Sequence, residues 1–392
     1  MMIVFVQPYS QKGPGGSSKI FSNLICGREH EVKTAIFGAQ PKTIEPATEV
    51  WHQERILRIH PLESTRFRPW LDNLWPLTWQ RCSSALEEYL DAIGPKHVHS
   101  IAHGLGFYPA YQWASRHDVD FSLTVHDDIR HLFQGHLWLN RIEEWLLDVW
   151  QNATHRFVIS PEMGKEYCRR YGDREWIQIT DGLEDDRIAS GPRSAIPNRL
   201  NVYFAGGLNV PYEPNFLALQ SALKRFSEER SESEVRLIAR GGRRLKGEDT
   251  SAPPIEVRPF ASQEEVLKDL DEVDVLYLPL SIEAKYANFA KFSLSTKMIT
   301  YLGSGLPIFY HGPEDSAAYR LLQRNDACLA CFSNDPAEIA AVLESLPQHR
   351  ERIVHNAIAL AQREFQIKKI RERFWSRIDA SVGNASGIAR TK

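Results

Sequence analysis

Short apolar runs alternate with segments of helical periodicity along the first half of the chain. The runs that predict strands lie at residues 3–6, 32–37, 98–102, 121–125 and 156–159. A loop rich in glycine and serine follows the first run, and a polar or helical segment follows each of the others. Because parallel strands need a crossover between them, this alternation indicates a parallel sheet with helices on both faces.

The same alternation starts again after a break at residues 190–199, where glycine and proline interrupt any periodic apolar pattern and indicate a linker. In the second half, strands are predicted at residues 200–205, 235–239, 255–257, 273–278 and 306–310, and helices at residues 216–226, 264–270, 296–302, 336–346 and 350–365. The chain is therefore expected to be an α/β protein of two Rossmann-like domains facing a central cleft.

The predicted domains are residues 1–190, residues 191–365, and a terminal helix and tail at residues 366–392. The helix carries Phe374, Trp375 and Ile378, which need burial. We expect it to cross back to the first domain.

Composition and charge are ordinary for a folded, soluble protein. The 392 residues are 43% hydrophobic and 25% charged, with a net charge of -3, which argues against disorder and against broad nucleic-acid binding. The apolar start of the chain lacks a basic region and a cleavage site, so it predicts a first strand and a cytoplasmic protein.

Glycine loops follow three of the predicted strands. They contain Gly15 and Gly16, then Gly206 and Gly207, then the segment from Arg240 to Gly242. Ligands of open parallel sheets bind beyond the carboxyl ends of the strands, where glycine lets exposed N–H groups approach a phosphate. Each loop taken alone also fits a tight turn, but three of them across two α/β halves favour a bound ligand. None has the G-x-G-x-x-G pattern of nicotinamide enzymes.

The segment FSLSTKMITYLGSGLP at residues 292–307 is the most informative one. Ser295 and Thr296 lie where a helix should begin, and both residue types satisfy the free N–H groups of a first turn. Lys297 in that turn is unfavourable for the helix dipole alone and is explained by a diphosphate beside it. The alternative is a capped helix with a solvated lysine.

This segment resembles the retaining GT-B glycosyltransferases of the family 4 type. The shared features are a serine–lysine step into a helix, a Tyr-Leu pair, a glycine and a proline. The Gly15–Gly16 loop is similar to the family's donor-phosphate loop, and TVHDD, which contains His126, is similar to its His-Asp step. The resemblance extends over most of the chain.

The chain departs from the family at two positions that normally carry glutamates. Phe292 and Thr300 occupy them here. The hydroxyl of Thr300 can still form one hydrogen bond to a ribose, whereas Phe292 cannot replace a carboxylate. The family's basic pair after the first strand of the second half is also missing, and Arg240 is the candidate substitute.

The resemblance implies a transferase that moves a sugar, with retention, from a nucleotide-sugar donor to a glycan, glycolipid or other hydroxyl acceptor in polysaccharide biosynthesis. His126 and Lys297 are the implied catalytic residues. The implied donor-binding residues are Gly15, Gly16, Gly206, Gly207, Arg240, Ser295, Thr296 and Thr300. The nucleotide sugar is a substrate, so no cofactor is expected; no metal is expected, and Asp127 and Asp128 are interpreted as a helix cap.

Two other functions stay open: a nucleotide-sugar epimerase of GT-B fold, and a degenerate GT-B protein that binds without catalysis. Trp70, Trp75 and Trp79 lie among arginines, which fits either a packed helix or a surface for sugar or peripheral contact with the inner membrane face. Trp138, Trp145 and Trp150 are predicted to lie in the core.

Overall fold

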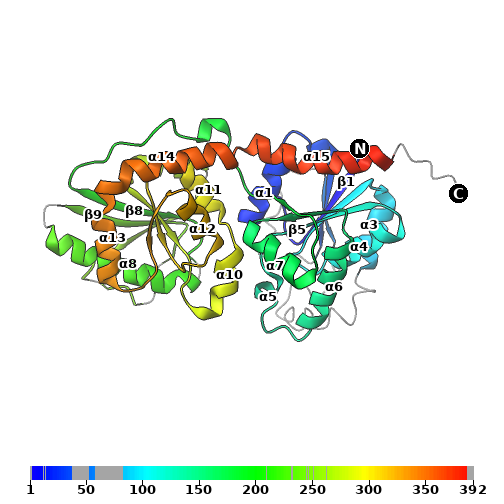
Figure 1. Cartoon of the computed structure of the whole chain (residues 1–392), viewed down its shortest axis with the longest axis horizontal. Coiled ribbons are helices and arrows are strands. Elements are labelled where there is room, and N and C mark those ends of the chain that lie inside the picture. Colours follow the sequence, from blue (N-terminus) through cyan, green and yellow to red (C-terminus); the bar gives the residue numbers. More distant parts are fainter. Residues whose placement is uncertain are drawn as a thin grey trace. The chain divides into compact units, whose positions relative to one another are not determined.

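The computed structural model describes residues 2–11, 13, 15–37, 53–57, 83–208, 210–230, 233–243, 245, 247–249, 251–261 and 263–385. The chain folds into two compact units (Figure 1). Unit 1 comprises Met1–Asp181 with Ile367–Lys392, and unit 2 comprises Gly182–Gln366. The segment at residues 58–82, which contains Trp70, Trp75 and Trp79, lies outside the described residues.

Unit 1 is built on a parallel sheet. Within the described residues it has seven strands in the order β3-β2-β1-β4-β5-β6-β7. The strands are β1 Ile3–Gln7, β2 Val32–Phe37, β3 Glu54–Leu57, β4 His97–Ile101, β5 Asp120–Val125, β6 His155–Val158 and β7 Ile177–Gln178. The helices are α1 Gly16–Ile25, α3 Ser84–Ile93, α4 Phe107–Arg116, α5 Ile129–Leu132, α6 Leu139–Asn152, α7 Pro161–Tyr171 and α15 Ile367–Ala385.

Unit 2 repeats this plan. Its sheet has six strands in the described part of the chain, in the order β10-β9-β8-β11-β12-β13, and all its strand pairs are parallel. The strands are β8 Arg199–Ala205, β9 Glu234–Arg240, β10 Ile255–Arg258, β11 Val275–Pro279, β12 Ile308–His311 and β13 Leu329–Cys331. The helices are α8 Glu213–Glu229, α9 Gln263–Asp269, α10 Ala287–Phe292, α11 Thr296–Leu302, α12 Ala317–Arg324, α13 Pro336–Glu344 and α14 Leu346–Glu364.

The strands are continuous apolar runs because both faces of each sheet are covered. All five residues of β1 and of β11 are buried. Figure 1 shows helices on both sides of the sheet within each unit. This burial is why the hydrophobic pattern alone located the central strands. The predicted α/β class with two parallel sheets is confirmed.

The division between the units comes earlier in the chain than the glycine- and proline-rich segment at residues 190–199. Unit 2 begins at Gly182, and the backbone of residues 183–193 is already bound within it. The N–H of Ala189 donates to the carbonyl of Gly303 at 2.8 Å, and the N–H of Arg193 donates to that of Gly305 at 2.8 Å. A segment without periodic structure is therefore packed in place by its main-chain hydrogen bonds.

The terminal helix α15 belongs to unit 1 and packs on α1. Phe374 lies against the rings of Phe5 and Phe157, with centroids 6.2 and 4.8 Å away. The indole N–H of Trp375 donates to the carbonyl of Leu24 at 2.8 Å. These large side chains bind the end of the chain to the core of unit 1.

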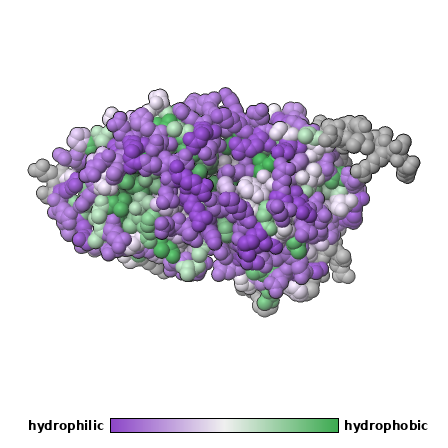
Figure 2. Space-filling view, viewed as in Figure 1, coloured by the Kyte–Doolittle hydropathy of each residue, from purple (hydrophilic) through white to green (hydrophobic). Residues whose placement is uncertain are grey.

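The surface is mostly polar. Figure 2 shows hydrophilic residues over most of the visible face, with hydrophobic residues between them. Among the residues described, no helix combines the length and the apolar character needed to cross a membrane.

Candidate functional site

The glycine loops follow the central strand of each sheet. In unit 1 the chain leaves β1 toward β2 on one side, and β4 pairs with β1 on the other. In unit 2 the strand β8 lies in the same way between β9 and β11. Each is a topological switch point, where open parallel sheets bind ligands at their carboxyl edge.

Gly206 and Lys297 come together at the switch point of unit 2. Gly206 has a φ of 132°, and its N–H donates to the carbonyl of Arg240 at 2.9 Å. A methyl group added to Gly206 would lie 3.1 Å from Cδ and 3.3 Å from Nζ of Lys297. Glycine is needed here both for its backbone conformation and for the space that the lysine uses.

Aromatic rings hold the ammonium of Lys297. Its Nζ lies 4.7 Å from the ring centroid of Phe204 and 5.3 Å from that of Tyr212. Among the described residues it has no carboxylate partner, and burial lowers its pKa to about 8. At neutral pH the side chain is mostly a cation in a desolvated setting, where an approaching anion is attracted strongly.

The start of α11 has the predicted capping residue. The hydroxyl of Ser295 accepts a hydrogen bond from the N–H of Lys297 at 3.3 Å, so the prediction of a Ser295 cap is confirmed. Thr300 donates its hydroxyl to the carbonyl of Thr296 at 3.2 Å, within the helix. Phe292 is 3% exposed and lies in the core of unit 2.

Arg240 uses its guanidinium inside unit 2. It forms a two-point ion pair with the buried carboxylate of Asp269 and donates to the carbonyl of Pro259 at 3.2 Å. Asp269 also accepts from Tyr203 at 2.7 Å and from Arg258 at 2.6 Å. The part of Arg240 that reaches the Gly206 turn is its main-chain carbonyl.

An exposed aromatic ring lies beside the second glycine turn of unit 2. Phe260 is 73% exposed, and a methyl group added to Gly241 would lie 2.7 Å from its ring. Gly241 itself lies next to the carbonyl of Gly206. Phe260 was not predicted as a site residue. Its position shortly after the strand predicted at residues 255–257 was the available signal.

The Gly15–Gly16 loop opens α1 in unit 1. Gly15 has a φ of 142°, and Gly16 is the first residue of the helix. The loop is held by the Ser18 hydroxyl, which donates to the carbonyl of Ser10 at 2.7 Å. No atom of the described residues lies within 4 Å of a methyl group added to Gly15, so a side chain would have space there. Glycine is needed at this position because of its φ angle.

His126 follows β5 and is buried with both ring nitrogens unused. It is 5% exposed, and its ring lies 5.2 Å from that of Phe21. Neither nitrogen has a hydrogen-bond partner among the described residues. Burial lowers its pKa to about 4, so the imidazole is neutral at pH 7. Buried polar atoms without partners are rare and indicate a missing ligand or water.

Two further polar side chains, those of His103 and Tyr9, lie at the same edge and were not predicted from the sequence. Nδ1 of His103, after β4, lies 3.2 Å from a carboxylate oxygen of Asp127. The ring of Tyr9, after β1, lies 5.8 Å from the ring of His103, and its buried hydroxyl has no hydrogen-bond partner in the described part of the chain. Their positions directly after predicted strands were the available signal.

Asp128 is the N-cap residue of α5, as predicted, but its carboxylate forms no capping hydrogen bond and instead binds Arg170 through two contacts of 2.6 and 3.3 Å. Asp127 pairs with His103. Within the described residues, no cluster of three or more potential metal ligands occurs. Trp145 and Trp150 are buried in α6, which confirms their assignment to the core. Trp138, at the start of this helix, is only half-buried, so its assignment to the core is wrong.

Comparison with solved structures identifies the architecture. HepE from Anabaena, solved in complex with UDP-glucose, matches 97% of this chain and 100% of its own at a TM-score of 0.70 and 11% sequence identity. The chain has the GT-B fold. No protein-family model matches the sequence, and neither does any curated protein.

Two other structures share this GT-B fold with the chain. An α,α-trehalose 6-phosphate synthase from Burkholderia multivorans matches 98% of this chain and 99% of its own, with a TM-score of 0.67 and 12% identity. A trehalose-6-phosphate synthase studied for glycosyl transfer with retention matches 97% and 99%, with a TM-score of 0.66 and 12% identity. At these identities the likeness concerns the fold.

Proposed function

We propose that this chain is a glycosyltransferase whose nucleotide-sugar donor places its diphosphate at the carboxyl edge of the unit 2 sheet. The observation that carries the proposal is the ammonium of Lys297, which contacts the Gly206 turn and has no carboxylate partner among the described residues. A buried cation without a carboxylate partner, placed at a switch point, is suited to binding an anionic ligand. The resemblance to UDP-glucose-bound HepE supports a nucleotide sugar.

The proposed role of Lys297 in sugar transfer follows from the negative charge that develops on the leaving group. Breaking the bond to the anomeric carbon leaves negative charge on the departing diphosphate, and a preorganised cation stabilises it. Lys297 is held by the rings of Phe204 and Tyr212 and therefore needs little reorganisation. The Gly206–Gly207 turn gives the diphosphate a close approach to the backbone, and the Gly15–Gly16 loop offers a second such surface.

Phe260 is suited to the nucleobase. Its exposed ring lies beside Gly241 at the edge that carries Gly206. Base stacking on an aromatic side chain contributes about 1–3 kcal/mol per base and accepts any base. In this proposal the ring supplies affinity for the nucleotide, while Lys297 acts on the diphosphate.

His126 is proposed to act on the sugar. A neutral imidazole has one N–H donor and one acceptor, so it can bind a hydroxyl through either nitrogen. Both nitrogens of His126 are unused among the described residues. Retention of configuration is proposed because a trehalose-6-phosphate synthase of the same fold is described as transferring with retention. The acceptor is proposed to be a glycan, a lipid-linked glycan or another hydroxyl compound, handled in the cytoplasm or at the inner membrane face.

The test is a calorimetric titration of the full chain with UDP, followed by a product assay with a panel of nucleotide sugars and hydroxyl acceptors. Lys297→Ala should weaken UDP binding roughly tenfold to a hundredfold, as expected for loss of a charge-assisted contact. Lys291→Ala is the control, because Lys291 also lies over an aromatic ring, that of Phe292, but at the end of α10. Equal UDP affinity in the wild type and Lys297→Ala would contradict the proposal.

A second candidate is a GT-B protein that binds without transfer. The observation that favours it is Phe292, a buried apolar side chain at a position where the resembled family carries a carboxylate. Tight nucleotide-sugar binding with no product from any acceptor would support this candidate. Conversion of the donor without an acceptor would instead indicate an epimerase.

A further inference from the structure

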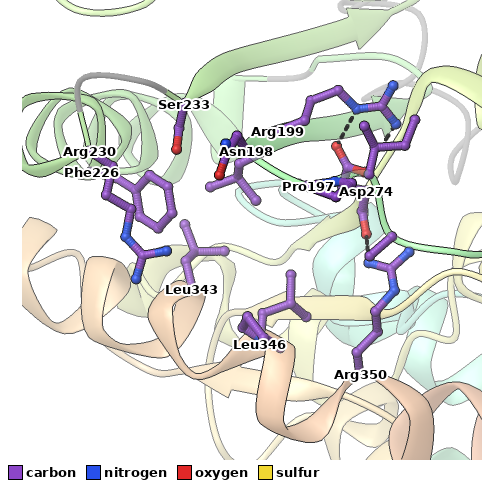
Figure 3. A pocket seen from close by; sticks show the side chains of 14 residues that line it. Pro197, Asn198, Arg199, Phe226, Arg230, Ser233, Asp274, Leu343, Leu346 and Arg350 are labelled. Atoms are coloured by element: carbon purple, nitrogen blue, oxygen red, sulfur yellow. Dashed lines mark hydrogen bonds and ion pairs between the residues drawn. The ribbon is translucent and has the colours of Figure 1, made fainter.

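A pocket lies at the edge of the unit 2 sheet opposite to the proposed donor site (Figure 3). Its volume is about 280 Å³. Arg199 opens β8, Ser233 directly precedes β9, and Asp274 directly precedes β11, so the pocket is at the amino ends of these strands. Gly206 and Lys297 lie at the carboxyl edge, so the pocket is not part of the proposed donor site.

The wall of the pocket contains an ion pair between Arg199 and Asp274. Arg199 binds both carboxylate oxygens of Asp274, at 2.8 and 3.0 Å, and the N–H of Asn201 donates to one of them at 2.9 Å (Figure 3). This carboxylate is buried, and its charge is matched by Arg199. It therefore leaves no negative charge to balance the other arginines of the pocket.

Two arginines in the wall have no carboxylate partner among the described residues. Arg350, from α14, donates to two main-chain carbonyls, that of Asp274 at 2.8 Å and that of Arg193 at 3.4 Å. Its Nε is buried and has no hydrogen-bond partner there. Arg230, at the end of α8, lies over the ring of Phe226, with its guanidinium carbon 4.7 Å from the centroid.

The rest of the wall is apolar. Phe226, Leu343 and Leu346 are buried, and Ile196 and Pro197 come from the segment before β8. Figure 3 shows the side chains of Leu343 and Leu346 between the two arginines, Arg230 and Arg350. The pocket thus combines an apolar body with two uncompensated positive charges, which is the composition of a site for a small amphipathic ligand.

We propose that this pocket binds a small carboxylate with an apolar body, of the arylcarboxylate class. Guanidinium groups bind carboxylates through paired N–H donors, and the exposed guanidinium of Arg230, which has no carboxylate partner among the described residues, supplies such a pair, while Arg350 adds a second positive charge to the wall. The volume is near the lower end of the range for small-molecule sites, about 300 Å³, which suits one ring with a short acidic arm. The apolar wall favours such a ligand over a bare anion.

The experiment is a calorimetric titration of the full chain with phenylacetate. Two comparison ligands separate the contributions: 2-phenylethanol keeps the ring without the charge, and inorganic phosphate keeps a charge without the ring. We expect phenylacetate to bind at least tenfold more tightly than either. No binding of phenylacetate, or equal binding of 2-phenylethanol or phosphate, overturns the proposal.

Variants locate the site. Arg230→Ala removes an exposed guanidinium and should weaken phenylacetate binding at least fivefold. Arg225→Ala, an exposed arginine on the same helix that does not line the pocket, is the matched control and should bind as the wild type does. Arg350→Gln should weaken binding further, and Arg350→Lys should restore part of it because the charge returns. Unchanged affinity in Arg230→Ala and in Arg350→Gln overturns the proposal.

The pocket and the proposed donor site are tested independently. UDP affinity should be unchanged in Arg230→Ala, and phenylacetate affinity should be unchanged in Lys297→Ala. Failure of UDP binding with phenylacetate binding intact would contradict the glycosyltransferase proposal alone. Competition between the two ligands for one site would overturn the assignment of the pocket.

Discussion

Two buried basic side chains, one at the carboxyl edge of each sheet, differ in charge at neutral pH: His126 in unit 1 is neutral and Lys297 in unit 2 is mostly charged. Both sheets nevertheless have a switch point at their first strand. In unit 1 the buried imidazole of His126 has its pKa lowered to about 4. In unit 2 the ammonium of Lys297 has its pKa lowered to about 8. Burial is the largest cause in both and opposes the charged form of each group. Because the two side chains start from pKa values of 6.5 and 10.5, the same effect leaves one neutral and the other mostly charged.

This difference shows how one fold provides two kinds of recognition. The neutral imidazole offers a donor and an acceptor suited to hydroxyl groups, whereas the ammonium attracts an anion. A sugar presents uncharged hydroxyl groups, whereas a diphosphate is an anion. The proposed function uses His126 for the sugar and Lys297 for the diphosphate, and each proposed role can be tested by a change at one edge.

The largest expected effect is on turnover in Lys297→Ala. Loss of one group that stabilises charge in the transition state lowers kcat roughly 100-fold to 1,000-fold. Steady-state kinetics with the preferred donor measures it. Lys291→Ala should keep kcat within about twofold, and a similar loss in both variants would point to a general effect on unit 2.

Gly206→Ala should lower kcat/KM roughly thirtyfold, corresponding to about 2 kcal/mol. The new methyl group meets Lys297, and φ is 132° there. Gly247→Ala separates these causes, because Gly247 has a φ of 88° and open space around an added methyl group. Both variants should lose stability, but only Gly206→Ala should lose activity; equal loss of activity would remove the contact with Lys297 from the explanation.

Acid should destabilise unit 1 more than unit 2. Burial lowers the pKa of His97 to about 3 and that of His126 to about 4, and it holds the pKa of His99 well below its usual value; all three lie in unit 1. In unit 2, the pKa of His311 is lowered to about 4. A histidine buried neutral supports folding above its unfolded pKa of about 6.5 and loses that support as the pH falls toward its folded value.

Each such histidine costs up to about 1.4 kcal/mol per pH unit within that window. Hydrogen exchange followed by mass spectrometry between pH 7 and pH 4, with rates corrected for intrinsic exchange, measures the two units separately. We expect protection in β4 and β5 to fall before protection in β11 and β12. The reverse order would contradict the pKa assignments.

His126→Asn should lower kcat roughly tenfold with little change in UDP affinity, because His126 is proposed to act on the sugar and not on the diphosphate. A melting curve accompanies the kinetics. A merely structural role would lower the melting temperature and leave kcat unchanged in the folded fraction. Equal loss of kcat and of UDP affinity would assign His126 to nucleotide binding.

The smallest expected effect is the loss of UDP affinity in mild alkali. As the pH rises through about 8, unbound Lys297 loses its proton, so affinity should fall about threefold between pH 7.5 and pH 8.5. Above about pH 7.5 the phosphate of UDP is already ionised and contributes little to this change. Titrations across this range check it, and the dependence should disappear in Lys297→Ala.

Much of the scaffold was predictable from the sequence. The strands β1, β2, β5, β8 and β12 lie where apolar runs predicted them, within two residues at either end, because parallel strands are buried on both faces. The cap at Ser295 was predictable from local chemistry alone. The strands β3 and β7 were missed because they lie at the two edges of the unit 1 sheet and are largely not buried, so their residues do not form an apolar run.

The partners of polar groups were less predictable. Asp128 is the N-cap residue of α5, but its carboxylate binds Arg170, 42 residues further along the chain. Arg240 was expected to hold the donor, yet its guanidinium pairs with Asp269 on α9. Both carboxylates are buried, and a buried charge requires an opposite charge that the fold brings from a distant segment.

The sequence by itself determined the two α/β halves, the glycine turns at their central strands and the presence of a lysine in the first turn of α11. These features depend on residues close together in the chain, so their spacing can be read from the amino-acid sequence. Only the tertiary structure decided three properties of the described residues. Lys297 lies beside Gly206 without a counter-charge from them, His126 is buried with both nitrogens unused by them, and two arginines that line a pocket at the amino edge have no carboxylate partner among them. Desolvation and pairing depend on what the fold packs around a group, and residues far apart in the sequence supply those surroundings.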